Sequence, residues 1–67
     1  MNKFVIILSY PNTDRIPTFE KISSKFLDRD LVLKEWAERT FNNDTEEICE
    51  FFTFEAMNEL IIQLVTI

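Results

Sequence analysis

A single cysteine, Cys49, in a chain of 67 residues is the feature that most limits how this sequence can fold. A chain this short buries only about 60% of its unfolded surface, so its core rarely contributes more than ~3–5 kcal/mol of net stability. Many small domains compensate with disulfides or a metal, but a lone cysteine forms no internal disulfide and has no second soft ligand. The chain must therefore rely on efficient packing or on association with another chain.

The composition indicates a folded chain that is not embedded in a membrane. Apolar residues make up 46% of the sequence and include seven phenylalanines, enough to form a core. The apolar segment Phe4–Leu8 is shorter than the ~7–15 residues of a signal-peptide core. Leu60–Ile67 is far shorter than the ~20 residues of a membrane span. A single cysteine is typical of a reducing compartment, and we expect a cytoplasmic protein with no membrane partner.

Two segments have the composition of buried strands. Lys3–Tyr10 is β-branched and aromatic, and Pro11 and Asn12 close it. Its apolar residues are consecutive, which predicts a central strand covered on both faces. Leu60–Ile67 has the same character, and we expect a final strand that is also buried on both faces.

The segment Thr18–Leu27 fits two secondary structures. Phe19, Ile22 and Phe26 have helical spacing, whereas two consecutive serines lower helix propensity. Ile22 and Phe26 would also share one face of a strand. Because a two-stranded sheet is marginal in water, we favour a strand that pairs with the first one.

Two helices are expected after this segment. Asp28 or Asp30 caps the first, which runs to about Asn42. Its apolar face has helical spacing and contains Leu33, Trp36, Ala37, Thr40 and Phe41, with Trp36 in the core. Asp44 is a good N-cap for the second helix, with Glu47 in the reciprocal position of a capping box. The inward face of that helix contains Ile48, Cys49, Phe51 and Phe52.

The predicted order is ββααβ, an α+β fold in which a short, mostly antiparallel sheet packs on two helices. If Thr18–Leu27 is helical instead, the order becomes βαααβ. Residues 1–67 are expected to form one domain.

The chain lacks the residues that many enzymes use. Without glycine it can form no P-loop, dinucleotide-binding fingerprint or Gly-x-Ser-x-Gly nucleophile elbow. Without histidine it lacks the commonest general base. Cys49 lies beside Glu50, an acidic neighbourhood that does not activate a thiol. We expect no catalytic residue, no cofactor and no metal ligand. An enzyme that uses carboxylates or a metal is the last of three hypotheses for this chain.

Charge is distributed unevenly along the chain. Residues 1–39 hold all seven lysines and arginines against six acids, whereas residues 40–67 hold six acids and no base. A net charge of −5 repels nucleic acid, so we expect no direct nucleic-acid binding. A negative region of this kind suits a protein partner that presents a basic surface.

A helical wheel of the second helix separates its acids from its apolar face. Glu46, Glu47 and Glu50 occupy the outward arc, and if the helix continues through Phe54, that ring falls between Glu47 and Glu50. If the helix ends at Thr53, Phe54 belongs to the core. An exposed aromatic ring inside an acidic rim is typical of an interface anchor. The predicted partner-binding residues are Glu46, Glu47, Glu50, Phe54, Glu55 and Glu59.

In size, acidity and ββα-type layout the chain resembles the small proteins that phages encode to bind and inhibit host or defence enzymes. The resemblance covers composition and layout and carries over no residue. It implies a viral, non-catalytic inhibitor or adaptor that binds a larger protein. The alternative is a self-associating structural or assembly subunit, a homodimer in which Leu60–Ile67 is buried against a second copy.

Overall fold

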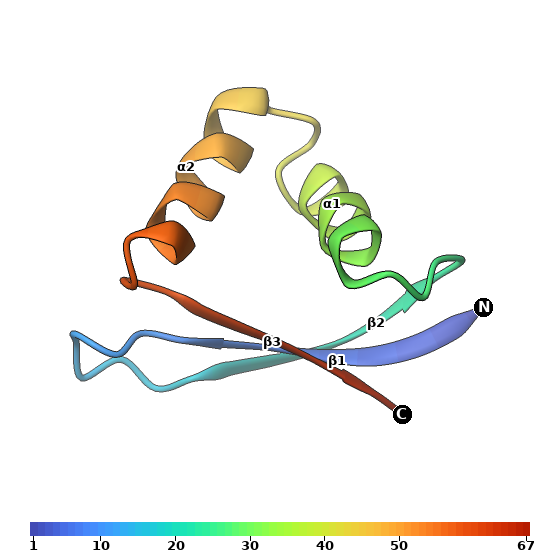
Figure 1. Cartoon of the computed structure of the whole chain (residues 1–67), viewed down its shortest axis with the longest axis horizontal. Coiled ribbons are helices and arrows are strands. Elements are labelled where there is room, and N and C mark those ends of the chain that lie inside the picture. Colours follow the sequence, from blue (N-terminus) through green and yellow to red (C-terminus); the bar gives the residue numbers. More distant parts are fainter.

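The computed structural model describes residues Met1–Ile67 and contains three strands and two helices in the order β-β-α-α-β. The strands form one antiparallel sheet, and both helices lie on the same face of it (Figure 1). The predicted α+β fold and its order ββααβ are confirmed. The elements are β1 Asn2–Ser9, β2 Thr18–Ser24, α1 Arg29–Thr40, α2 Thr45–Ala56 and β3 Ile61–Thr66.

β1 is the central strand, as predicted, with β2 on one side and β3 on the other. Val5 lies opposite Lys21 of β2 and Val65 of β3. Because side chains alternate between the faces of a strand, these three residues share one face and the even-numbered residues of β1 share the other. Phe4 and Ile6 are buried, so the even-numbered face of β1 is the one beneath the helices.

The sheet is covered on one face only, and the prediction that β1 and β3 are buried on both faces is wrong. On the uncovered face Val5 and Ile7 are half-buried, and Ile61 and Val65 of β3 are both 46% exposed. Figure 1 shows no element on that side of the sheet. Only residues 41–44 join α1 to α2, a link too short to carry the second helix around the sheet edge.

The core lies mainly between the sheet and α1. Trp36 is in it, as predicted, with 4% of its surface exposed. Its Nε1–H donates to Glu20 Oε2 at 3.3 Å, and its ring packs against Phe41 and Phe51. Because Phe51 belongs to α2, these aromatic contacts hold the two helices together. The buried apolar residues are Phe4, Ile6, Ile22, Val32, Leu33, Trp36, Ala37, Leu60 and Ile62.

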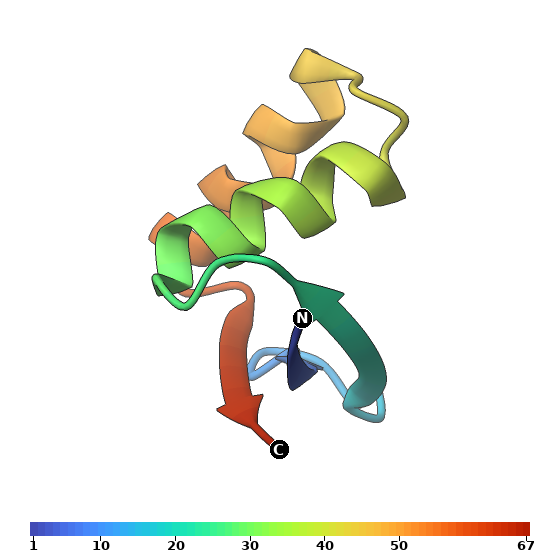
Figure 2. The same ribbon diagram turned by 90° about the vertical axis from the view of Figure 1, so that its right-hand side faces the viewer.

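α1 crosses over the sheet from β3 to β2 (Figure 2) and bonds to both edge strands. Its N-cap is Asp28, one of the two predicted candidates. Near this end Arg29 Nη2 donates to the carbonyl of Ile62 in β3 at 3.1 Å. Near the other end Arg39 Nη2 donates to the carbonyl of Ser23 in β2 at 3.2 Å. The two arginines therefore fix the position of the helix across the sheet.

Asparagines take the role of glycine in the turns around α2. Asn42, Asn43 and Asn58 have φ values of 53°, 61° and 61°. Asparagine tolerates this left-handed region better than most residues with a side chain. The first two follow the end of α1, close to the predicted boundary, and Asn58 turns the chain from α2 towards β3.

α2 begins after its predicted N-cap, Asp44, whose carboxylate accepts the N–H groups of Glu46 and Glu47. The predicted reciprocal bond from the Glu47 side chain does not form, because the Asp44 N–H donates to the Phe41 carbonyl at 3.0 Å. The Glu47 carboxylate is therefore not used in capping.

The inward face of α2 is narrower than predicted. Ile48, Phe51 and Phe52 pack against the core but are only half-buried, and no residue of α2 is fully buried. Cys49 is exposed, so the prediction that it faces the core is wrong. It lies about 100° around the helix from Ile48, outside the strip that contacts α1 and the sheet.

Candidate functional site

Phe54 is an exposed aromatic residue in the last turns of α2. α2 continues through Phe54 to Ala56, as is required for the ring to lie between Glu47 and Glu50 on the helix surface. Because 49% of its surface is exposed, Phe54 does not belong to the core. Three depressions of the surface meet at this ring, and together they form the candidate site.

Two of the depressions lie along the acidic side of α2. The first, of about 310 Å³, is lined by Glu47, Glu50 and Phe54 together with Phe41 and Phe51. The second, of about 370 Å³, is lined by Glu46, Glu50 and Phe54. We call Glu46, Glu47 and Glu50 the acidic rim. All three residues are exposed.

The acidic rim has no basic partner within the chain. The ion pairs of the molecule join Arg29 to Asp30 and Glu55, and Arg39 to Glu35. Since none of them involves the rim, its negative charge is not offset by a direct contact. A second molecule with a basic surface would meet that charge on approach.

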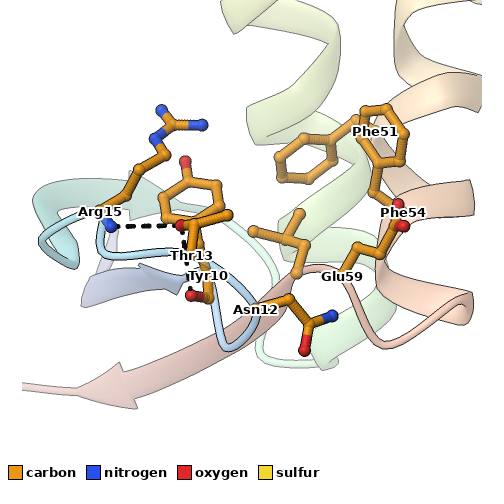
Figure 3. Close-up of a pocket in the computed structure, with 8 residues that line it drawn as sticks. Tyr10, Asn12, Thr13, Arg15, Phe51, Phe54 and Glu59 are labelled. Carbon is orange, nitrogen blue, oxygen red and sulfur yellow. Dashed lines mark hydrogen bonds between the residues drawn. The ribbon is translucent and has the colours of Figure 1, made fainter.

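A larger hollow, of about 550 Å³, opens beside Phe54 (Figure 3). Phe51 and Phe54 of α2 and Leu60, which directly precedes β3, supply its apolar lining. Tyr10 and Arg15 face them from the loop between β1 and β2. The hollow thus combines apolar walls with a few polar groups, which is typical of sites that accept a side chain or small ligand.

Local interactions hold the β1–β2 loop against this hollow. The Thr13 N–H donates to the Tyr10 carbonyl, and Thr13 Oγ1 accepts the Arg15 N–H, both at 3.2 Å. The Arg15 guanidinium lies 3.9 Å from the centre of the Tyr10 ring, a cation–π contact. Asn12 Nδ2 donates to the Asn58 carbonyl at 3.4 Å, which joins the loop to the turn after α2.

Five of the six predicted partner-binding residues line these depressions. The acidic rim and Phe54 line the two on the acidic side, and Glu59 lines the hollow together with Phe54. Glu55 lies apart from them: it is half-buried, and its Oε2 is 3.2 Å from Arg29 Nη2. Tyr10 and Arg15 were not predicted, because nothing in the sequence indicates that their loop packs beside α2.

No group of three or more Cys, Asp or Glu side chains lies close enough together to hold a metal ion. Neither helix has the length and apolarity needed to cross a bilayer.

Comparison of the chain with protein-family models, with curated proteins and with solved structures gives no match.

Proposed function

We propose that this protein is a non-catalytic protein-binding module, an inhibitor or adaptor, whose α2 surface binds a basic surface of a larger protein. The observation that carries the proposal is the exposed Phe54 ring, which lies between the acidic rim and the apolar hollow. An exposed aromatic residue surrounded by charge and next to a pocket has the composition of an interface anchor.

The acidic rim and Phe54 would contribute to binding in different ways. Unpaired surface carboxylates steer a positively charged partner and speed its encounter, an effect that weakens as salt concentration rises. The ring of Phe54 would be buried on contact, and buried apolar area slows dissociation. The rim therefore mainly affects the association rate, and Phe54 mainly affects the dissociation rate.

The hollow beside Phe54 suggests what the partner inserts. Its lining includes the apolar residues Phe51, Phe54 and Leu60, with Arg15 and Glu59 as charged neighbours. An aliphatic or aromatic side chain with a basic residue near it would satisfy both the hollow and the acidic rim. A partner surface of this kind also matches the exposed basic patches by which many enzymes bind anionic substrates.

Small, acidic, compact modules of this layout resemble phage-encoded inhibitors, and we propose that this protein acts in that manner in the cytoplasm. Blocking an enzyme requires only a rigid surface that fits its basic patch. The module itself needs no cofactor and no catalytic residue for such a role.

The test is a charge reversal on the acidic rim, Glu47→Lys combined with Glu50→Lys. The immobilised protein is first used to capture partners from a lysate of its native cell at low and high salt. The partner that is retained is then purified and titrated by calorimetry. We expect the double variant to lose at least about 2 kcal/mol of binding free energy, a fall of roughly 30-fold in affinity.

The matched control carries the same charge change on α1, Asp30→Lys with Glu38→Lys, away from the depressions around Phe54. Phe54→Ala should weaken binding by a similar amount while mainly raising the dissociation rate. Far-UV circular dichroism checks that each variant is folded. An affinity that is unchanged in the α2 double variant, or reduced equally in the α1 control, would exclude the acidic surface as the binding site.

A further inference from the structure

The two edges of the sheet differ in how well they are protected from pairing with another strand. β2 carries Glu20 and Lys21 and follows Pro17, features that discourage edge-to-edge association. β3 has the sequence Ile-Ile-Gln-Leu-Val-Thr, with no charged residue and no proline. Figure 2 shows no strand or helix beside β3 on its outer side. An uncharged, uncovered edge of this kind is a template for strand addition.

The hydrogen-bond pattern identifies the groups of β3 that face outward. The Ile67 N–H donates to the Lys3 carbonyl at 3.0 Å, so these two residues form a hydrogen-bonded pair between β3 and β1. In an antiparallel ladder such pairs occur at every second residue. The odd-numbered residues of β3 therefore bond to β1, and Ile62, Leu64 and Thr66 direct their N–H and C=O groups to the outer edge.

One of these three positions is already engaged. The Ile62 carbonyl accepts the hydrogen bond from Arg29, which confirms that its backbone faces outward. This guanidinium also pairs with Glu55, so it covers one end of the edge. Leu64 and Thr66 remain, and they are two residues apart, the repeat at which an antiparallel partner forms its bonds.

We infer that β3 pairs with β3 of a second copy of this chain, antiparallel about a two-fold axis. In the register that leaves the Arg29 bond intact, Leu64 of each copy lies opposite Thr66 of the other. Each such pair exchanges two backbone hydrogen bonds, which gives four across the axis. Val65 of one copy then faces Val65 of the other on the uncovered side of the sheet, so an apolar residue meets an apolar residue.

A second copy fits this edge for reasons of symmetry and charge. Across a two-fold axis, the outward N–H and C=O groups of Leu64 and Thr66 in each copy bond to the same groups of the other copy. Because β3 is neutral, this pairing brings no like charges together. Stacking two uncovered sheet faces would be less favourable. That face carries Lys3 and Lys21 and no acid, so stacking it on its own copy would bring surfaces of like charge together.

The resulting dimer has one six-stranded sheet and displays two α2 surfaces. Two acidic surfaces on one particle would raise the avidity for a partner with repeated basic patches. The pairing itself does not depend on the function proposed for α2, since it uses only β3.

Disulfide trapping tests the register. Val65→Cys is made in a Cys49→Ser background, which removes the exposed native thiol. Opposed residues that are not hydrogen-bonded to each other have Cα atoms about 4.5 Å apart, within the range that a disulfide can bridge. The matched control is Lys21→Cys in the same background. Lys21 and Val65 lie on the same face of the sheet and both are opposite Val5 of β1, but Lys21 belongs to the other edge strand, β2.

Under mild oxidation we expect Val65→Cys to form a covalent dimer about tenfold faster than Lys21→Cys, because pairing raises the effective thiol concentration. Equal rates for the two variants, or a Val65→Cys protein that stays monomeric, would overturn the inference. A Val65→Cys protein that stays monomeric is the result expected if β3 pairs with a strand of a different protein and not with its own copy.

Sedimentation tests the backbone bonds without a thiol. Thr66 is exposed, and Thr66→Pro removes an outward N–H without removing a bond to β1, whereas Thr66→Val keeps the N–H. Two of the four bonds are lost in the proline variant, so dimerisation should weaken by roughly 30-fold. A wild-type protein that remains monomeric at several hundred micromolar, or equal dimerisation of the two variants, contradicts the pairing.

Discussion

Replacing Trp36 by alanine should unfold most of this domain at room temperature. The indole is 4% exposed, and its ring centre lies 6.2 Å from that of Phe41 and 5.4 Å from that of Phe51. Truncating a buried tryptophan to alanine typically costs ~3–5 kcal/mol. A core of this size rarely supplies more than ~3–5 kcal/mol in total, so the loss is comparable to the whole stability.

A smaller substitution separates packing from hydrogen bonding at this site. Trp36→Phe keeps an aromatic ring but removes the Nε1–H that donates to Glu20 at 3.3 Å. Glu20 is exposed and can bond to water instead, so we expect a cost of about 1–2 kcal/mol from one hydrogen bond and the lost ring volume. The Trp36→Phe protein should therefore remain folded in the absence of denaturant.

Both variants are measured by urea unfolding followed by far-UV circular dichroism, because the tryptophan fluorescence is lost with the residue. Phe54→Ala serves as the control, since it truncates a ring that is 49% exposed and should cost less than the buried substitution. A Trp36→Ala protein with the same transition midpoint as the wild type would refute the assignment of Trp36 to the core.

Two further substitutions test local features of α2. Asp44→Ala removes the carboxylate that accepts the N–H groups of Glu46 and Glu47, and it should lower the free energy of unfolding by about 1 kcal/mol, measured by urea denaturation. Asp44→Asn, which retains a capping oxygen, should recover most of this loss. Cys49→Ser should change stability by no more than about 0.5 kcal/mol, because the thiol is exposed, and a larger loss would mean that the side chain packs in solution.

The order of the elements could be predicted because most of them have a local signal. Thr18–Leu27 has none that is decisive, and only the marginal stability of a two-stranded sheet favours a strand there. Asp28 and Asp44 mark the helix starts, and the structure confirms both as N-caps. The asparagines at positions 42 and 43 mark the end of α1. The β-branched and aromatic residues of Lys3–Tyr10, closed by Pro11 and Asn12, indicate a strand. The capping and turn signals act over a few residues and can be recognised before the packing of the elements is known.

Coverage of the sheet could not be predicted in the same way. Consecutive apolar residues such as Ile6 and Ile7 indicate a strand that is buried on both faces. They do not indicate whether elements of the same chain pack on both faces. Because a short link joins the two helices, they form a single layer on one face of the sheet. Ile61 and Val65 are therefore exposed in the single chain, although the sequence pattern is typical of strands that are buried on both faces.

The candidate site could be predicted only in the part that lies on one element. Helical periodicity alone places Glu47, Glu50 and Phe54 on neighbouring turns, and the structure brings them to one depression. The larger hollow on the other side of Phe54 could not be predicted, because Tyr10 and Arg15 in its wall come from a loop more than thirty residues away. Glu55 follows the same acidic pattern yet is paired with Arg29, because that contact depends on how α1 crosses the sheet.

The two helices have the same length but unequal burial. α1 contributes Val32, Leu33, Trp36 and Ala37 to the core, whereas α2 contributes no fully buried residue. Half-buried rings, chiefly that of Phe51, hold α2 in place, so less apolar area secures it. A partner that covers Phe54 would add contacts on the open side of α2 and stabilise the folded chain by mass action. On this reasoning the helix that contributes least to the isolated fold is the one whose packing a bound partner would complete.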